Sequence, residues 1–523
     1  MGKRILLVQP PILYWRWFEI APTLPHLLSI GSYLKQNGFE VDMVDMQIAK
    51  NSSMNDGWVT FKTLHDFVEI SERILTSYKY DILAVSCWTS LHYVPSLLLS
   101  LISKVINAES ISVVGGYHPS TMPSDFVKLI SEGQVKILDS EKRLVDIPDK
   151  LVSFAEEAQR ASNVMFDYVV KGEGENAFLQ ICRRHETKPK KGGHEASVVS
   201  GEPLNDLDKI DYDFSLLSEA YDPSTSLLRK DLCNKTFPIH LSRGCPFDCE
   251  FCIEKSKGTH NWRAVSPRKA ADMIRNIKKT FGPKRIQFMD VCFGADSEWT
   301  RKFIALLAQE DNSETMYWCE TAVNCTSMDK LKEFSKVPIE VDFGVESASP
   351  RILALMKKTH DPHSFIEHHR KLVENCIKLS IPSTSFFVWG FPGESKETLK
   401  ETLTYQKQML SIAEKFPYID SEGQDFRLAP GSDVYSKMEH YSERYGTVFR
   451  CPDWWTYVST NLDQLATAVD PSKDLTLEEK REIYERELAP NLSHIIAQKL
   501  RDYMCVSARL TTHSNRSLSI RAA

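Results

Sequence analysis

The stretch SRGCPFDCEFCIEK, from Ser242 to Lys255, carries three cysteines at the spacing C-x3-C-x2-C. Three thiolates on one short loop can hold either zinc or an iron–sulfur cluster. Structural zinc takes four protein ligands, usually as two pairs, and no second C-x2-C or H-x3-H motif is placed to complete such a site. A 4Fe–4S cluster with one open iron fits three thiolates better, and its open iron can bind a chelating substrate. The stretch therefore favours a cluster.

Around these cysteines, short apolar runs alternate with helical patterns, which predicts strands and helices in turn. One expected helix, Pro267–Thr280, begins with Ser266 and Pro267 at cap and first-turn positions. Six βα units indicate an open, partial barrel, (βα)6, with its chemistry at the strand C-terminal ends. The cysteine loop follows the first strand. The expected strands are Phe237–Cys245, Arg285–Asp290, Met316–Val323, Ile339–Ser347, Ser383–Gly390 and Asp425–Gly431.

The first 180 residues also alternate, and they predict a doubly wound parallel sheet. Helices are expected at Leu24–Gln36 and Val94–Ile106. Ligands on such sheets bind beyond the strand C-terminal ends, where QPP, SCWTS, GGYHPS and KGEGE fall. No G-x-G-x-x-G follows the first strand, which disfavours a plain dinucleotide site. The expected strands are Arg4–Gln9, Glu40–Asp45, Asp81–Trp88, Ile111–Gly116 and Asp167–Glu175.

The two alternating halves suggest an α/β protein of four parts. Residues 1–185 form the first domain, and residues 237–432 form the barrel. Between them, residues 186–236 read as a linker, because the polar, glycine-bearing run from Arg183 to Asp213 predicts an exposed connector with little core. Residues 433–523 are expected to form a small helical region without further strands.

Composition limits the possible partners and location. The formal charge is −6 and there is no long basic stripe, so we expect no nucleic-acid partner. No run approaches the roughly 18 apolar residues of a membrane helix. The apolar run in the opening MGKRILLVQPP is too short for a signal peptide. Of the 12 cysteines only the triad clusters, which argues for reduced thiols. We expect a cytoplasmic protein.

The cysteine stretch resembles the signature of radical S-adenosylmethionine (SAM) enzymes, in which an aromatic residue, here Phe251, precedes the last cysteine. The resemblance implies that Cys245, Cys249 and Cys252 bind a 4Fe–4S cluster whose fourth iron takes the amine and carboxylate of SAM. It also implies that Asp290 helps to position the methionyl group and that Glu346 meets the ribose. The run GFPGES (Gly390–Ser395) resembles the loop near the adenine.

The first half, with GGYHPS and then KGEGE before such a core, resembles the cobalamin-binding radical SAM proteins over roughly residues 4–432. The resemblance makes residues 1–185 a cobalamin-binding domain. We assign His118 to the loop rather than to cobalt, since the one D-x-H motif, Asp361-Pro362-His363, lies in the other half and lacks the usual glycine. The residues expected to enclose the corrin or its nucleotide tail are Ser86, Thr89, Gly115, Gly116, His118, Gly172, Glu173 and Gly174.

The resemblance implies a cobalamin-dependent radical SAM methyltransferase that uses a 5′-deoxyadenosyl radical and methylcobalamin to methylate a carbon centre. The substrate would be a small molecule or a peptide, and the electron donor a flavodoxin or ferredoxin. The aromatic runs Tyr14–Phe18 and Cys451–Trp455 either line a substrate cavity or simply pack.

Three alternatives remain. Relatives of the same architecture catalyse cyclisation or rearrangement without methyl transfer, and nothing in the motifs separates them. The chain could instead be a non-catalytic cobalamin or metal binder. A methylthiotransferase is disfavoured, because such enzymes usually carry a second cysteine triad and the first half has only Cys87 and Cys182.

Overall fold

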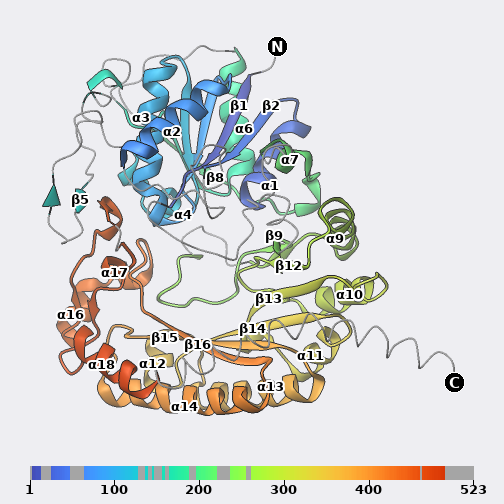
Figure 1. Cartoon of the computed structure of the whole chain (residues 1–523), viewed down its shortest axis with the longest axis vertical. Helices are drawn as coiled ribbons and strands as arrows, with labels where there is room; N and C mark the ends of the chain where they lie inside the picture. Colours follow the sequence, from blue (N-terminus) through green and yellow to red (C-terminus); the bar gives the residue numbers. More distant parts are fainter. Residues whose placement is uncertain are drawn as a thin grey trace.

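The computed structural model describes residues 3–12, 25–46, 64–127, 136–138, 144–145, 153, 156–158, 164–187, 196–220, 236–254, 261–459 and 462–488. Two six-stranded sheets dominate these residues. In Figure 1 the first sheet (blue to cyan) lies above the second (green to orange), and the C-terminal elements (orange to red) run along one side.

The first sheet is parallel throughout, in the order β2-β1-β3-β4-β7-β8. Alternate residues of β1 bury opposite faces: Ile5 and Leu7 pack with Leu27 of α1, whereas Leu6 and Val8 pack with Phe67 of α2. The prediction of a doubly wound sheet is confirmed. Its elements are β1 (Arg4–Gln9), α1 (Pro25–Gln36), β2 (Glu40–Asp45), α2 (Leu64–Ser77), β3 (Ile82–Ser86), α3 (Tyr93–Ile106), β4 (Ile111–Gly115), α4 (Tyr117–Thr121), β7 (Tyr168–Gly172) and α6 (Gly174–Thr187).

The segment predicted as a linker contributes to this first unit. Strand β8 (Ser197–Gly201) pairs in parallel with β7, and α7 (Ser215–Ala220) packs against β2. Leu204, Leu207 and Ile210 are buried in the core. The prediction of a connector with little core is therefore wrong, and residue 185 falls before the last strand of the sheet. The β8 residues are mostly exposed at the sheet edge, so the strand lacks the apolar run that identifies buried strands.

The second sheet has the order β16-β15-β14-β13-β12-β9 and is also parallel. This arrangement confirms the partial barrel. Its strands are β9 (Thr236–Ile239), β12 (Arg285–Phe288), β13 (Met316–Ala322), β14 (Ile339–Glu346), β15 (Ser383–Trp389) and β16 (Ile419–Asp425). Its main helices are α9 (Pro267–Phe281), α10 (Ser297–Leu307), α11 (Met328–Phe334), α12 (Pro350–Leu355), α13 (Pro362–Leu379) and α14 (Lys396–Lys415).

The sixth strand lies earlier than predicted. Strand β16 spans Ile419–Asp425 and pairs with β15 along its whole length, so the prediction of a strand at Asp425–Gly431 is wrong. Its sequence, IDSEGQD, is mostly polar and has low strand propensity. Pairing with the neighbouring strand, rather than local preference, forms it.

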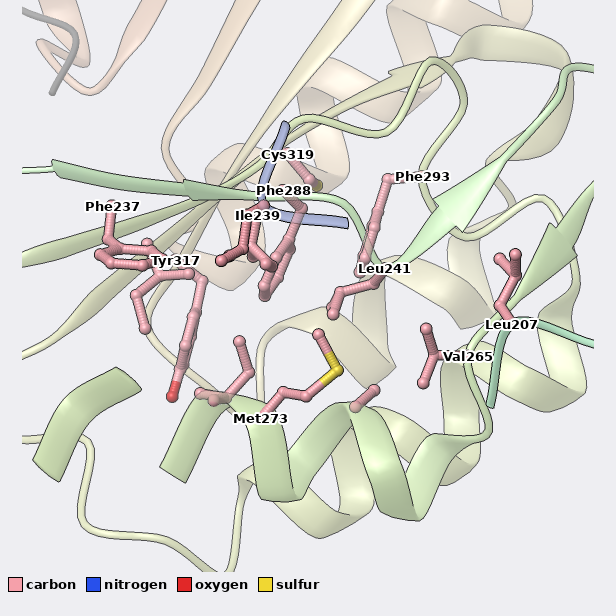
Figure 2. Packing of buried hydrophobic residues seen from close by; sticks show 14 of the residues in the cluster. Leu207, Phe237, Ile239, Leu241, Val265, Met273, Phe288, Phe293, Tyr317 and Cys319 are labelled. Carbon is pink, nitrogen blue, oxygen red and sulfur yellow. The ribbon is translucent and has the colours of Figure 1, made fainter. Parts of the chain in front are cut away.

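Large apolar side chains pack between the first strands of the second sheet and helix α9. Figure 2 shows Phe237 and Ile239 of β9, Phe288 of β12 and Tyr317 of β13 over Met273 of α9. All but Met273 are at most 1% exposed. Each such side chain stabilises the fold by about 1.5–3 kcal/mol relative to exposure. This packing holds the first strand end, and with it the loop, in place.

The described part of the C-terminal region, residues 433–459 and 462–488, is mainly helical, as predicted, but it also contains short strands that the sequence analysis missed. Strand β18 (Tyr457–Val458) pairs with β5 (Lys136–Leu138), which also pairs with β6 (Leu144–Val145), and so joins the C-terminal region to the first half. No helix among the residues that the structure describes is long and apolar enough to cross a membrane. The region comprises α15 (Asp433–Ser436), α16 (Met438–Tyr445), β17 (Val448–Phe449), β18 (Tyr457–Val458), α17 (Leu462–Ala466), β19 (Val469–Asp470) and α18 (Leu477–Glu487).

The aromatic run Cys451–Trp455 packs against the first half. The Trp455 indole N–H donates to Asp125 at 2.9 Å, and its ring lies 5.5 Å from the His118 ring. Trp454 and Trp455 are both buried. The packing interpretation therefore holds for this run, whereas Tyr14–Phe18 lies outside the described residues.

Candidate active site

The cysteine loop begins where β9 ends and is anchored by Glu250, one of the two residues between its last two cysteines. After β10 (Ser242–Arg243), Gly244 takes a positive φ of 84°, and the three cysteines follow. The Glu250 carboxylate is buried and pairs with Lys437 at 2.9 Å and with Lys357 at 2.6 Å. These contacts tie the loop to α15, α16 and the end of α12.

The triad is a soft donor set, with Cys249 buried and Cys245 and Cys252 partly buried. Burial raises the pKa of the Cys249 thiol and raises that of Cys252 to about 12, while a hydrogen bond with Cys292, followed by burial, raises that of Cys245. Without metal the thiols therefore hold their protons, and iron binding would displace them. Among the described residues no three His, Cys, Asp or Glu side chains are arranged to hold a single metal ion. Three thiols on one loop fit a 4Fe–4S cluster with an open position.

Asp290 lies at the end of β12, where the sequence analysis expected it, but its contacts in the structure are with the backbone before the cysteines. Its carboxylate accepts the N–H of Leu241 at 3.1 Å and that of Ser242. Burial raises its pKa to about 7. Asp290 thus holds the turn that leads into the loop, and its role in positioning SAM stays a prediction.

Glu346, at the end of β14, forms a partly buried ion pair that the sequence analysis missed. Its carboxylate accepts from Lys358 Nζ at 2.8 Å, and its φ is 68°. Burial lowers the pKa of Lys358, but Glu346 and the Cys249 thiol outweigh it and hold the pKa above its usual range. A carboxylate and an ammonium thus lie beside the triad, where SAM, which has an amine, a carboxylate and ribose hydroxyls, could contact both. The adjacent Lys357 and Lys358 look alike in sequence, and only the fold gives them different partners.

The loop GFPGES is a structured turn and helix cap. The Gly390 N–H donates to the Glu394 carboxylate at 2.5 Å, and burial raises the pKa of Glu394 to about 8. Ser395 and Thr398 form a capping box at the start of α14. The proximity of this loop to the adenine stays a prediction.

In the first half, the loops after β3 and β4 pack on each other. A Cβ at Gly116, whose φ is 119°, would lie 2.6 Å from the Cys87 backbone. His118 is buried, with Nδ1 bonded to Ser90 at 2.6 Å and Nε2 to Asp125 at 3.1 Å. Both ring nitrogens are engaged within the domain, which supports the assignment of His118 to the loop. The same edge holds three more of the predicted residues. Ser86 is buried at the end of β3, Thr89 caps the next turn, and Gly115 ends β4.

The edge also presents an exposed aromatic side chain. Trp88 follows β3 and is 37% exposed, beside the rings of His26 and His92. Beneath it the Gln9 amide donates to His92 at 2.9 Å and accepts from His26 at 3.1 Å. These residues lie between β1 and β3, where the strand order reverses and ligands of such sheets bind. An exposed indole over buried polar groups fits a bulky planar ring system such as a corrin.

The KGEGE loop is tied directly to the cysteine loop. The Arg243 guanidinium pairs with Glu173 at 3.1 Å and with Glu175 at 2.6 Å, and Arg263 also pairs with Glu173. A Cβ on Gly172 would meet the Gly201 carbonyl at 2.8 Å, and one on Gly174 would meet the Ile30 side chain at 3.1 Å, so packing within the domain accounts for both glycines. The Glu173 carboxylate is thus occupied by arginines, and a contact with the corrin stays a prediction.

A second contact joins the two halves beside the third cysteine. The Tyr117 hydroxyl donates to Glu254 at 2.5 Å, and the Glu254 N–H donates to the Cys252 sulfur at 3.4 Å. Tyr117 belongs to GGYHPS in the first half. The two groups of loops therefore meet, so reactive groups held by one half would lie against the other.

Comparison with known proteins agrees with this arrangement. The family model of the radical SAM superfamily matches residues 239–405. An uncharacterized methyltransferase of Pyrococcus horikoshii is 25% identical over 64% of this chain and 66% of its own. The anaerobic magnesium-protoporphyrin IX monomethyl ester cyclase of Cereibacter sphaeroides is 25% identical over 45% of this chain and 40% of its own. The chain thus spans less than two thirds of the length of either relative.

The fold has a solved counterpart. The radical SAM methyltransferase TsrM of Kitasatospora setae, solved with cobalamin and a [4Fe–4S] cluster, matches with a TM-score of 0.57 at 15% identity, over 86% of this chain and 80% of that one. Residues 239–405 form a radical SAM domain, and the chain around it shares the two-sheet fold of TsrM.

Proposed function

We propose that the protein is a cobalamin-dependent radical SAM methyltransferase that methylates a carbon centre. The observation that carries the proposal is the meeting of two sets of loops. The Tyr117–Glu254 hydrogen bond brings the loop after β4 to the cysteine loop, beside Cys252. Methyl transfer between two cofactors needs their reactive faces in one space, and this arrangement supplies it. The methyltransferase names of the Pyrococcus relative and of TsrM agree with the proposal.

Each half would hold its own cofactor. Cys245, Cys249 and Cys252 would bind the cluster, and we propose that Glu346, Lys358 and Asp290 would lie on the side of SAM; the Glu346–Lys358 ion pair supports this proposal. Trp88, Ser86 and Thr89 would contact cobalamin. When bound, the cluster with SAM supplies a 5′-deoxyadenosyl radical, and cobalamin supplies a transferable methyl group.

The residues of the chain orient these groups and exclude water. The ion pairs of Arg243 and the hydrogen bond of Tyr117 close the junction between the two sets of loops. The packed core beneath β9 keeps the cysteine loop fixed. We propose a small molecule or a peptide as substrate and a flavodoxin or ferredoxin as electron donor, within the cytoplasm.

The experiment is an isotope assay under anaerobic conditions. The reconstituted protein, supplied with methyl-deuterated SAM and candidate substrates, should give a product heavier by one labelled methyl group. S-adenosylhomocysteine and 5′-deoxyadenosine should form together, because separate SAM molecules supply the methyl group and the radical. The variant with Cys245, Cys249 and Cys252 all changed to Ala should lose the cluster and form no 5′-deoxyadenosine. An undiminished cluster in this variant would place the ligands elsewhere.

A second candidate is cyclisation or rearrangement without methyl transfer. The likeness to the anaerobic cyclase of Cereibacter sphaeroides, over 45% of this chain, favours it. The same assay separates the two functions. A product without the label, formed with 5′-deoxyadenosine alone, would move the assignment to this class. Absence of any reductive SAM cleavage by cluster-loaded protein would instead indicate a non-catalytic binder.

A further inference from the structure

Two cysteines outside the triad lie at the same end of the barrel. Cys292 follows β12, and Cys325 ends the short helical turn Val323–Cys325 that follows β13. Strands β9, β12 and β13 are neighbours and run in parallel. The carboxyl ends of neighbouring parallel strands lie at one edge of the sheet, so three successive strand ends bring Cys245, Cys292 and Cys325 together.

The three thiols interact in sequence, with a hydrogen bond between Cys292 and Cys325. The Cys292 thiol donates to the Cys325 sulfur, with the two sulfurs 3.5 Å apart. The Cys245 thiol interacts with the Cys292 thiol, and this interaction raises the pKa of Cys245. Cys292, the middle thiol, is only 1% exposed, whereas Cys245 and Cys325 are partly buried.

The backbone around both additional cysteines is held from outside. The Trp262 indole N–H donates to the Cys292 carbonyl at 3.0 Å, and the Lys330 ammonium donates to the Cys325 carbonyl. These contacts fix the positions of the two thiols independently of the cysteine loop.

We propose that Cys292 and Cys325 form a thiol relay that donates a hydrogen bond to the sulfur of Cys245 when Cys245 binds the cluster. The inference rests on the proposed function, since it requires a cluster on Cys245. An iron-bound thiolate has no proton to donate and can only accept. The hydrogen bonds must then run from Cys325 through Cys292 to Cys245.

The relay acts on the reduction potential of the cluster. The electron that enters the cluster increases the negative charge on its sulfur ligands, and a donor to such a sulfur stabilises the reduced form. The hydrogen bond therefore raises the potential and eases reduction by the electron donor. Cys292 and Cys325 are positioning residues in this sense and need not touch SAM or substrate.

The test is an anaerobic redox titration of the reconstituted full-length protein, followed by the electron paramagnetic resonance signal of the reduced cluster. Cys292→Ala should shift the midpoint potential to a lower value at unchanged iron content. Cys325→Ala should shift it less in the same direction, and Cys292→Ser, which keeps a donor, should restore part of the loss. Cys376→Ala, which removes an equally buried thiol from α13, is the matched control and should leave the potential unchanged.

Two results would overturn the relay. One is an unchanged potential in Cys292→Ala protein with full iron content. The other is loss of iron in that variant but not in Cys376→Ala, because Cys292 would then be a ligand. A parent protein that binds no iron would refute the proposed function, and the relay with it, so the two failures are distinguishable.

Discussion

At the scale of single residues, Asp290 shows how the fold holds the cysteine loop. Its carboxylate is buried and accepts the N–H groups of Leu241 and Ser242, which lead into the loop. These hydrogen bonds favour the charged form, but burial outweighs them and raises the pKa to about 7. At pH values between the unfolded pKa of about 3.9 and the folded pKa, Asp290 carries a proton in the folded protein but not in the unfolded chain. The contribution of Asp290 to stability is therefore greatest at low pH and falls as pH rises to 7.

This linkage predicts a pH-dependent effect of Asp290→Asn. The stability advantage of the parent over the variant should shrink as pH rises from 5 to 7, by at most about 1.4 kcal/mol per pH unit. Urea denaturation of the metal-free, reduced parent and variant at several pH values measures this difference in the free energy of unfolding. Asp474→Asn, at an exposed site, should show no such trend. A parent–variant difference that is constant between pH 5 and 8 would contradict the assignment.

At the scale of elements, helix α9 and the loop before α4 use glycine for different reasons. Gly282 ends α9 in the left-handed region, at φ 56°, and a Cβ there would meet nothing within 4 Å. Gly116 combines a φ of 119° with a close approach to the Cys87 backbone. The first glycine supplies only a backbone conformation, whereas the second also supplies space.

The two substitutions to alanine should therefore differ in cost. Gly282→Ala should lower the free energy of unfolding by about 1 kcal/mol, the cost of the left-handed conformation. Gly116→Ala should cost about 2–4 kcal/mol, because the loops after β3 and β4 must also move apart. Chemical denaturation of the two variants in parallel gives the comparison. Equal costs would show that the loops adjust freely and that the close approach is unimportant.

At the scale of the whole molecule, buried charges join the two sheets. Arg243 precedes the cysteines, and it pairs with Glu173 and Glu175 of the first unit. Burial raises the pKa of Glu175, but Arg243 outweighs it and holds the pKa below its usual value. These ion pairs link the KGEGE loop of the first half to the cysteine loop of the second half. The paired side chains are at most 19% exposed. Breaking these ion pairs should loosen the junction as a whole.

Arg243→Met should lower stability by about 3–5 kcal/mol, because it leaves the Glu175 carboxylate buried without a cation, whereas Glu173 keeps its ion pair with Arg263. The two halves should then unfold in separate transitions in calorimetry. The loss of stability should shrink below about pH 5, where the Glu175 carboxylate of the unfolded chain takes up a proton, because Arg243 holds its pKa below the usual value in the folded parent. Arg275→Met, which removes an exposed ion pair at 55% exposure, should cost less than about 1 kcal/mol. A single unshifted transition in Arg243→Met would refute this view of the junction.

Much of the architecture was predictable from local pattern. The periods of apolar residues predicted both parallel sheets and the place of the cysteine loop, because burial on both faces imposes continuous apolar strands. The spacing of the cysteines predicted the type of site, because ligands of one cluster must lie close together on one loop. The strands β8 and β16 were missed or misplaced, because one is exposed at an edge and the other is polar.

The sequence by itself determined the class of fold, the order of its parts and the three thiols of the site. The tertiary structure alone decided which distant residues meet there: Arg243 with Glu173, Tyr117 with Glu254, Lys358 with Glu346 and Cys292 with Cys325. The physical reason is that the spacing of apolar residues along a short stretch indicates only which of its side chains are buried. Contacts between strand ends depend on sheet order, register and the docking of the two halves, which no short stretch of the chain encodes.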